Sequence, residues 1–175
     1  MTTEELIDLR TCIMEGRNHD ALEIIDELDA MSKKDIIRKI KSYLTVMLIH
    51  LIKNQVEGRL TNSWAASIRN AVREIQDLNL KPNKTSYYFK KDEWGEAIAQ
   101  VIEAAIRDAS VETLDGNCSP FQLKEMVETT QVTENTLSLL SLIYEHQPEV
   151  LPAIIDDNLA LLPGGEDWKF GSRNK

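Results

Sequence analysis

Apolar side chains recur every three to four residues along most of this chain, and no long stretch alternates apolar and polar residues as a half-buried strand does. That spacing places the apolar side chains on one face of a helix. A second stripe with the same period covers residues 64–78. We therefore expect an all-α protein. The longest stripe consists of Ile36, Ile37, Ile40, Tyr43, Leu44, Met47, Leu48, Leu51 and Ile52.

Capping and turn-forming residues divide the N-terminal half into four predicted helices. Three of them cover residues 3–15, 18–28 and 32–57, the third opening with Ser32 and Asp35 in the manner of a capping box. The turn at 58–62 is short, and a short turn after a long helix favours an antiparallel neighbour. The fourth helix, 64–78, should therefore form a helical hairpin with the third.

The second half continues as shorter helices after a loop that begins near Pro82. We expect helices over about 93–114, 119–129 and 133–146, and a final helical region beyond Pro148. The fold class is thus a helical bundle built on a long hairpin, with additional C-terminal helices. The expected domains are a bundle at 1–116, a C-terminal helical extension packed on it at 117–168, and a flexible tail at 169–175.

The charge is segregated along the chain. Residues 1–30 carry two basic and nine acidic side chains, residues 31–91 carry thirteen and four, and residues 92–175 carry five and sixteen. One interpretation is that the acidic helices neutralise the basic segment within the monomer. The alternative is that the basic segment leaves a face open to an anionic partner.

Other features limit the class of protein. The longest apolar run, residues 43–52, is half of the roughly twenty residues that a membrane helix needs. The first ten residues are acidic where a signal peptide would be basic and apolar, which predicts a cytoplasmic protein. Cys12 and Cys118 have no CxxC or Cys/His spacing, so we expect neither a disulfide nor a metal site.

Catalytic chemistry finds little support. His50 ends the apolar run, where a hydrogen-bonded structural imidazole is expected more than a general base. Its spacing to Glu57 lacks the further ligands of a metal site, and no phosphate-binding loop or GxSxG element is present. We expect no catalytic residue, metal or cofactor.

Several short sequence motifs lie between residues 26 and 74. They are an acidic helix, His-Leu-x-Lys at 50–53, an arginine in the turn, Ser-Trp at 63–64, Ile-Arg at 68–69 and Arg-Glu at 73–74. In this order they resemble the bacterial helical family known as domain of unknown function twenty-nine, over roughly residues 6–112. The resemblance implies an all-helical fold and no particular activity. The family pattern has an aromatic residue after the lysine, where this chain has Asn54. The candidate cluster is Glu27, His50, Lys53, Arg59, Trp64, Arg69, Arg73 and Glu74.

This cluster has two interpretations. In the first, Trp64 anchors the hairpin by burying its ring, and Arg69 and Arg73, one turn apart, pair with acidic residues of the 26–29 segment, namely Asp26, Glu27 and Asp29. In the second, four cations form a phosphate-binding cradle. Its members would be Lys53, Arg59, Arg69 and Arg73.

The C-terminal helices suggest protein contacts. Residues 122–145 have the outline of a helix-turn-helix, but the second helix has no Lys or Arg to meet DNA phosphates. The apolar groups of 137–144 and 150–162 exceed one helix face, which predicts a homodimer through these helices.

We therefore expect a non-enzymatic protein that binds another protein, without membrane insertion. One alternative is an acidic inhibitor or antitoxin-like regulator of a nucleic-acid enzyme. The other alternative is a nucleic-acid-associated protein that uses the basic segment 31–91.

Overall fold

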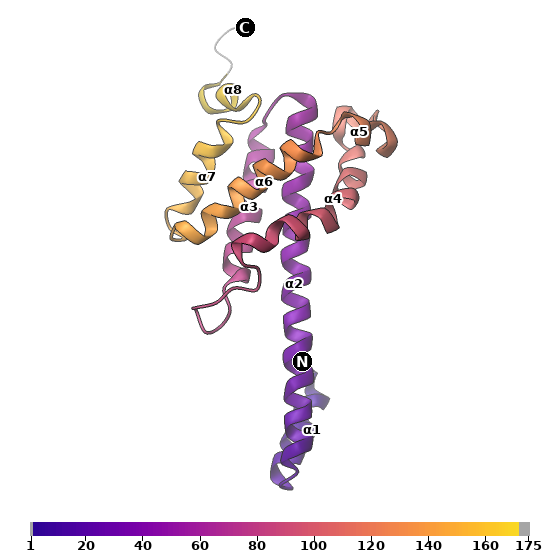
Figure 1. Cartoon of the computed structure of the whole chain (residues 1–175), viewed down its shortest axis with the longest axis vertical. Coiled ribbons are helices and arrows are strands. Elements are labelled where there is room, and N and C mark those ends of the chain that lie inside the picture. Colours follow the sequence, from indigo (N-terminus) through magenta and orange to yellow (C-terminus); the bar gives the residue numbers. More distant parts are fainter. Residues whose placement is uncertain (1, 172–175) are drawn as a thin grey trace. The chain divides into compact units, whose positions relative to one another are not determined.

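A computed structural model describes residues 2–171 and is built from helices throughout (Figure 1). Within these residues the only strand-like pairing is an isolated bridge between Leu80 and Tyr87. The predicted all-α fold class is confirmed. The helices are α1 (Thr3–Met14), α2 (Asn18–Glu57), α3 (Asn62–Asn79), η1 (Lys91–Glu93), α4 (Trp94–Ser110), η2 (Thr113–Gly116), α5 (Pro120–Met126), α6 (Thr129–Glu145), α7 (Leu151–Leu159) and α8 (Gly165–Phe170), where η marks a 3₁₀ helix.

The chain forms two compact units that divide within α2. The N-terminal unit ends at Lys39 and comprises α1 and the first part of α2. The C-terminal unit begins at Ile40 and comprises the rest of α2 and all later helices.

The predicted break between residues 28 and 32 is wrong, because α2 runs without interruption from Asn18 to Glu57. No Gly or Pro occurs in these forty residues. Ser32 resembles a helix start, but a capping residue does not end the helix that precedes it. A helix commonly ends at Pro, which cannot donate the i→i−4 hydrogen bond, or at Gly, which readily leaves the helical φ and ψ angles.

The N-terminal unit begins with a capping box formed by Thr2 and Glu5. The Thr2 hydroxyl accepts from the Glu5 N–H at 3.3 Å, and the Glu5 carboxylate accepts from the Thr2 N–H at 2.8 Å. Gly16 ends the first helix with a positive φ of 72°. Only Cys12 and Ala21 are buried among the described residues of this unit. The unit therefore has almost no core of its own.

The C-terminal unit contains the hydrophobic core. The second part of α2 and α3 form the predicted hairpin, and the Thr61 hydroxyl caps α3 by accepting from the Trp64 N–H at 3.1 Å. Helices α6 and α7 pack on α3, and α5 packs on α4. The largest side chains that are fully buried are Trp94, Ile40, Leu44, Met47, Leu48, Leu51, Ile52, Ile68, Ile75, Ile98, Leu123 and Leu140.

The start of α6 differs from the prediction of Thr133. The helix begins at Thr129, because the Gln55 side chain holds the backbone just before it. Gln55 Oε1 accepts from the Glu128 N–H at 2.9 Å, and Gln55 Nε2 donates to the Glu128 carbonyl at 3.2 Å. The cap thus comes from α2, far away in sequence. By contrast, the predicted start of α5 is confirmed, with Ser119 as the N-cap and Pro120 as the first residue.

The apolar residues of the C-terminal helices are used mainly within the chain. Six of them are buried, so the surplus that suggested a dimer through these helices is largely accounted for by packing on α3 and α4. Val150 and Leu161 stay exposed. Of the predicted tail 169–175, Lys169 and Phe170 belong to α8, and residues 172–175 lie outside the described residues. The six buried residues are Leu139, Leu140, Ile143, Leu151, Ile155 and Leu159.

Candidate functional site

Lys53 is the most unusual polar residue of the predicted cluster because it is buried. Its side chain leaves the end of α2 and is 7% exposed, and its Nζ donates to Glu112 Oε2 at 2.8 Å. The same Nζ lies 4.6 Å from the centre of the Trp64 ring. A buried ammonium group loses its water, and the carboxylate and the ring face replace part of that stabilisation. These contacts identify Lys53 as one member of a structural ion pair with Glu112.

Trp64 lies in contact with two cations. Trp64 is 8% exposed, which confirms the predicted burial of this residue. The Arg59 guanidinium carbon lies 4.7 Å from the ring centre, and Arg59 also pairs with Glu57 at 3.2 Å. Since Lys53 contacts the same ring, Trp64 joins the end of α2, the turn and the start of α3. This is the anchoring role that the sequence predicted.

His50 lies one helical turn before Lys53 and carries an unsatisfied polar atom. Its Nδ1 is buried and, among the described residues, has no hydrogen-bond partner. The expected hydrogen bond is therefore wrong for this nitrogen. Burial lowers the pKa of His50, and the Lys53 charge lowers it further, while Glu112 acts in the opposite direction. The imidazole is accordingly held in its neutral form.

This environment predicts that the protein loses stability as the pH falls from 7.5 to 5.5. The pKa of His50 is lower in the folded than in the unfolded chain, so the unfolded chain binds the proton more readily. The stability that the neutral His50 contributes is complete above the unfolded pKa of about 6.5 and is lost as the pH falls below it. Lys53 also lowers the pKa of Glu112, but this shift changes the stability only below about pH 4.5.

Thermal melts at both pH values test this prediction. His50→Gln removes the titrating group and should show a smaller loss of melting temperature than the unmodified protein. His146→Gln is the matched control and should behave like the unmodified protein. An equal pH dependence in His50→Gln would contradict the assignment.

Asn54 is a buried residue whose role the sequence did not reveal. It is 1% exposed, and its Nδ2 donates to the Arg59 carbonyl at 3.1 Å and to the Pro163 carbonyl at 2.8 Å. Asn54 thereby ties the α2–α3 turn to the turn between α7 and α8. The signal was present in the sequence as an amide where the family pattern has an aromatic residue, but its partners are distant in sequence.

Arg69 has a different acidic partner from those predicted. Its Nη1 lies 2.7 Å from Asp156 Oδ1 on α7, and helices α3 and α7 pack together. The side chains of the pair are 29% and 39% exposed, so this link contributes modestly to stability. Asp26, Glu27 and Asp29 are exposed residues of the N-terminal unit.

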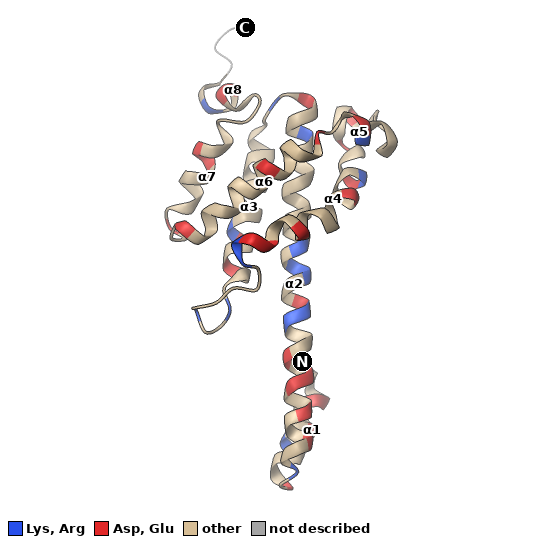
Figure 2. Ribbon diagram, viewed as in Figure 1, with Lys and Arg blue, Asp and Glu red and all other residues tan. Residues whose placement is uncertain are grey.

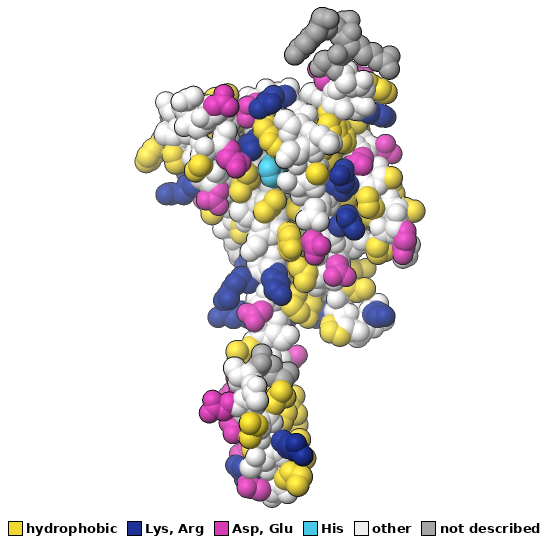
Figure 3. All heavy atoms as spheres, turned by 180° about the vertical axis from the view of Figure 1, so that it is seen from behind, with side chains coloured by type: hydrophobic (Ala, Val, Ile, Leu, Met, Phe, Trp, Pro, Cys, Tyr) yellow, Lys and Arg dark blue, Asp and Glu magenta, His cyan; other side chains and the backbone are white. Residues whose placement is uncertain are grey.

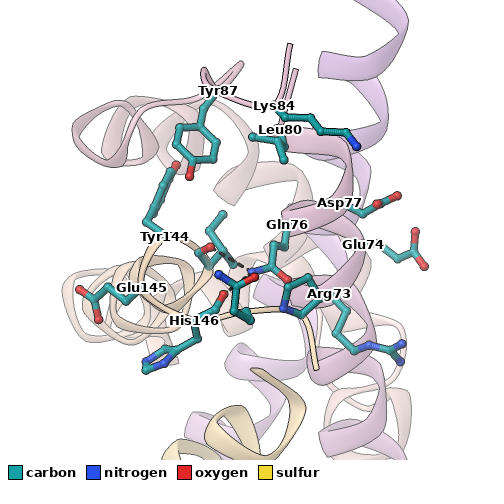
Figure 4. Close-up of a pocket in the computed structure, with 13 residues that line it drawn as sticks. Arg73, Glu74, Gln76, Asp77, Leu80, Lys84, Tyr87, Tyr144, Glu145 and His146 are labelled. Atoms are coloured by element: carbon teal, nitrogen blue, oxygen red, sulfur yellow. Dashed lines mark hydrogen bonds between the residues drawn. The ribbon is translucent and has the colours of Figure 1, made fainter. Parts of the chain in front are cut away.

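Arg73 and Glu74 line an open groove between α3 and the end of α6 (Figure 4). Its volume is about 580 Å³. Gln76 crosses the groove and donates to the carbonyls of Ile143 and His146 at 3.0 and 2.9 Å, which satisfies the C-terminal end of α6. The groove mixes both signs of charge and therefore shows no preference for an anion or a cation. Its charged lining is Arg73, Glu74, Asp77, Lys84 and Glu145.

The seven candidate residues that belong to the C-terminal unit therefore do not converge on one site. Lys53, Arg59, Trp64 and His50 lie around the corner between α2 and α3, while Arg73 and Glu74 line the groove. Three of the four cations of the proposed phosphate cradle have acidic partners within the chain. Within residues 2–171, no three His, Cys, Asp or Glu side chains are grouped closely enough to hold a metal ion.

A known protein family matches most of the chain. The family described as domain of unknown function DUF29 matches residues 8–137, about three quarters of the chain. The chain belongs to this family. No curated protein and no solved structure matches the chain.

The DUF29 match extends from α1 into α6, so it contains all eight candidate residues. The match ends before α7 and α8. Asp156, the partner of Arg69, lies on α7, and Pro163, whose carbonyl accepts from Asn54, lies between α7 and α8. None of the helices among the described residues is both long and apolar enough to cross a membrane.

A broad apolar surface of this DUF29 protein lies on the N-terminal unit. Figure 3 shows apolar side chains gathered on one side of α1 and the first part of α2. Sixteen large apolar residues are exposed in the described chain, and seven of them belong to the N-terminal unit. Leu22 and Ile25 are exposed because two helices alone cannot cover a face this broad. The seven are Leu6, Ile7, Ile13, Met14, Leu22, Ile25 and Met31.

Proposed function

We propose that this protein acts by binding another protein, without catalysis, through the exposed apolar face of its N-terminal unit. The seven exposed apolar residues of that unit carry the proposal. Monomeric soluble proteins rarely expose a contiguous apolar patch of more than a few hundred Å², and a larger patch commonly marks an interaction surface. The same unit has only two buried residues, so the face is poorly used within the unit.

The polar residues of the C-terminal unit support a role without catalysis. Lys53 is neutralised by Glu112, and the His50 Nδ1 has no hydrogen-bond partner in the described chain. Tyr144 donates to the Phe89 carbonyl and accepts from Trp94 Nε1 at 2.7 Å, and burial raises the pKa of its hydroxyl. These groups hold helices together and have little freedom to transfer a proton to a bound molecule.

The inhibitor alternative needs a free acidic face on residues 92–157. Several acidic side chains of this segment instead form ion pairs within the chain, with basic residues of the middle segment or of α5. The structure therefore gives this alternative no specific support. The four acids are Glu103, Glu112, Glu145 and Asp156.

The nucleic-acid alternative predicts binding through the basic segment 31–91, and we expect none that is measurable at physiological salt. Five cations of that segment already have acidic partners, and the net charge of −9 repels polyanions. Fluorescence anisotropy with duplex DNA and RNA at low and physiological salt tests this. Micromolar binding with a steep salt dependence that disappears in Arg69→Glu/Arg73→Glu would overturn it.

Affinity capture from cells of the source organism tests the proposed function. The bait is the full chain, and the test variant is Leu22→Asn/Ile25→Asn on the apolar face. The matched control is Leu161→Asn, since Leu161 is 84% exposed but lies in the C-terminal unit. A protein, either a second copy or another chain, should be captured by the unmodified and control baits and lost with the test variant. Equal capture by all three baits would contradict the proposal.

A further inference from the structure

We propose that the partner on this face is a second copy of the chain, so that two N-terminal units pair in antiparallel orientation and form a four-helix bundle. The inference rests on the proposed function and names the occupant of the same surface. It places self-association in α1 and the first part of α2, and not in the C-terminal helices.

The small size of the N-terminal unit is the first argument. It has fewer than forty residues and two helices, and a unit of this size rarely builds a sufficient core without a disulfide, a metal or association. Cys12 is a free thiol, and no metal cluster is present in the described residues. A second helical pair would supply the two missing sides of a bundle.

The extent of the apolar face is the second argument. The seven exposed residues each have between 44% and 79% of their surface accessible, and Leu9, Ile24 and Leu28 beside them are half-buried. A stable interface buries about 800 Å² per partner and has an apolar centre. Seven such aliphatic side chains supply the apolar centre of an interface of that size.

Charge along α2 decides the orientation. Residues 18–31 contain five acids and neither Lys nor Arg, whereas residues 32–39 contain four basic residues and one acid. Figure 2 shows this change from acidic to basic positions along the helix. A parallel pair would place like charges opposite each other, while an antiparallel pair places the acidic part of each copy beside the basic part of the other.

The register follows from the same pattern. If the two α2 helices cross near Ala30, Lys33 lies opposite Glu27 of the second copy and Lys34 lies opposite Asp26. The two-fold axis repeats both pairs, which gives four ion pairs for one interface. All four residues are exposed in the single chain and are available for these pairs.

Sedimentation of the full chain at about 10–50 µM tests the inference. The unmodified protein should sediment as a dimer, and Leu22→Asn/Ile25→Asn should sediment as a monomer. Leu161→Asn, on the C-terminal unit, should remain a dimer. Circular dichroism verifies that each variant keeps its helix content.

A charge exchange makes the test specific for the antiparallel register. Lys33→Glu/Lys34→Glu and Asp26→Lys/Glu27→Lys each place like charges opposite each other, so each should dimerise about tenfold more weakly or worse. Mixed in equal amounts, they should form a heterodimer with the affinity of the unmodified protein, because both sets of pairs are restored with reversed sign.

Different outcomes separate the inference from the proposed function. A monomer at these concentrations, together with capture of a different protein that Leu22→Asn/Ile25→Asn abolishes, overturns the second copy and keeps the proposed function. A dimer that Leu161→Asn disrupts and Leu22→Asn/Ile25→Asn does not would place association on the C-terminal helices and overturn the inference. Failure of the charge-exchanged variants to recover affinity on mixing would overturn the antiparallel register.

Discussion

Trp64→Ala should lower the free energy of unfolding by about 3–5 kcal/mol, the range for truncating a large buried aromatic residue. The ring is almost fully buried at the start of α3 and also contacts the charged ends of Lys53 and Arg59. Its loss leaves a cavity at the corner between α2 and α3. It also removes the ring face that partly compensates the burial of Lys53.

Urea unfolding followed by circular dichroism measures this change. Trp168→Ala is the matched control: Trp168 is half-buried in α8, and its Nε1 donates to Asn62 Oδ1 at 3.2 Å. It should cost clearly less than Trp64→Ala. Equal and small losses for both variants would show that Trp64 is not an anchor of the hairpin.

Gly164→Ala should destabilise the protein by about 2–5 kcal/mol, from a positive φ and a backbone clash together. Gly164 has a φ of 70°, and a Cβ atom there would lie 2.6 Å from the Cα of Arg59. The obstacle is backbone and cannot rotate away. The α2–α3 turn and the turn before α8 would have to separate, and this would stretch the bond from Asn54 to Pro163.

Gly58→Ala separates the two contributions. Gly58 has a φ of 64° in the facing turn, but a Cβ atom there meets nothing within 4 Å. It should therefore cost only the conformational part, about 1–2 kcal/mol. Equal losses of stability in Gly58→Ala and Gly164→Ala would show that the close approach of the two turns does not contribute.

Local patterns in the sequence were sufficient to predict the helices but not the distant residues that contact them. The apolar period identified the all-α fold and the α2–α3 hairpin, and the predicted helix start at residue 119 agrees with the N-cap of α5. The start of α6 was misplaced because its backbone is held by Gln55, and no local signal reports a cap that comes from another helix.

The candidate residues were only partly interpretable for the same reason. Burial of Trp64 follows from its size and its place in a helical stripe. The partners of Lys53 and Arg69 lie 59 and 87 residues further along the chain, and charge counts do not identify which acid meets which base. The exposed face of the N-terminal unit was missed because helical periodicity identifies an apolar face but not whether anything covers it.

The hydrogen bond from Asn54 to Pro163 joins residues 109 positions apart, and this has a consequence for how the chain is synthesised and divided. A nascent chain emerges N-terminus first, so the corner between α2 and α3 gains this bond only after Pro163 has left the ribosome. A fragment cut at residue 137, where the family match ends, would lack Asp156 and Pro163 and leave Arg69 and the buried Asn54 amide short of acceptors. The smallest part of the C-terminal unit able to fold independently therefore extends past the family boundary, to at least the turn that precedes α8.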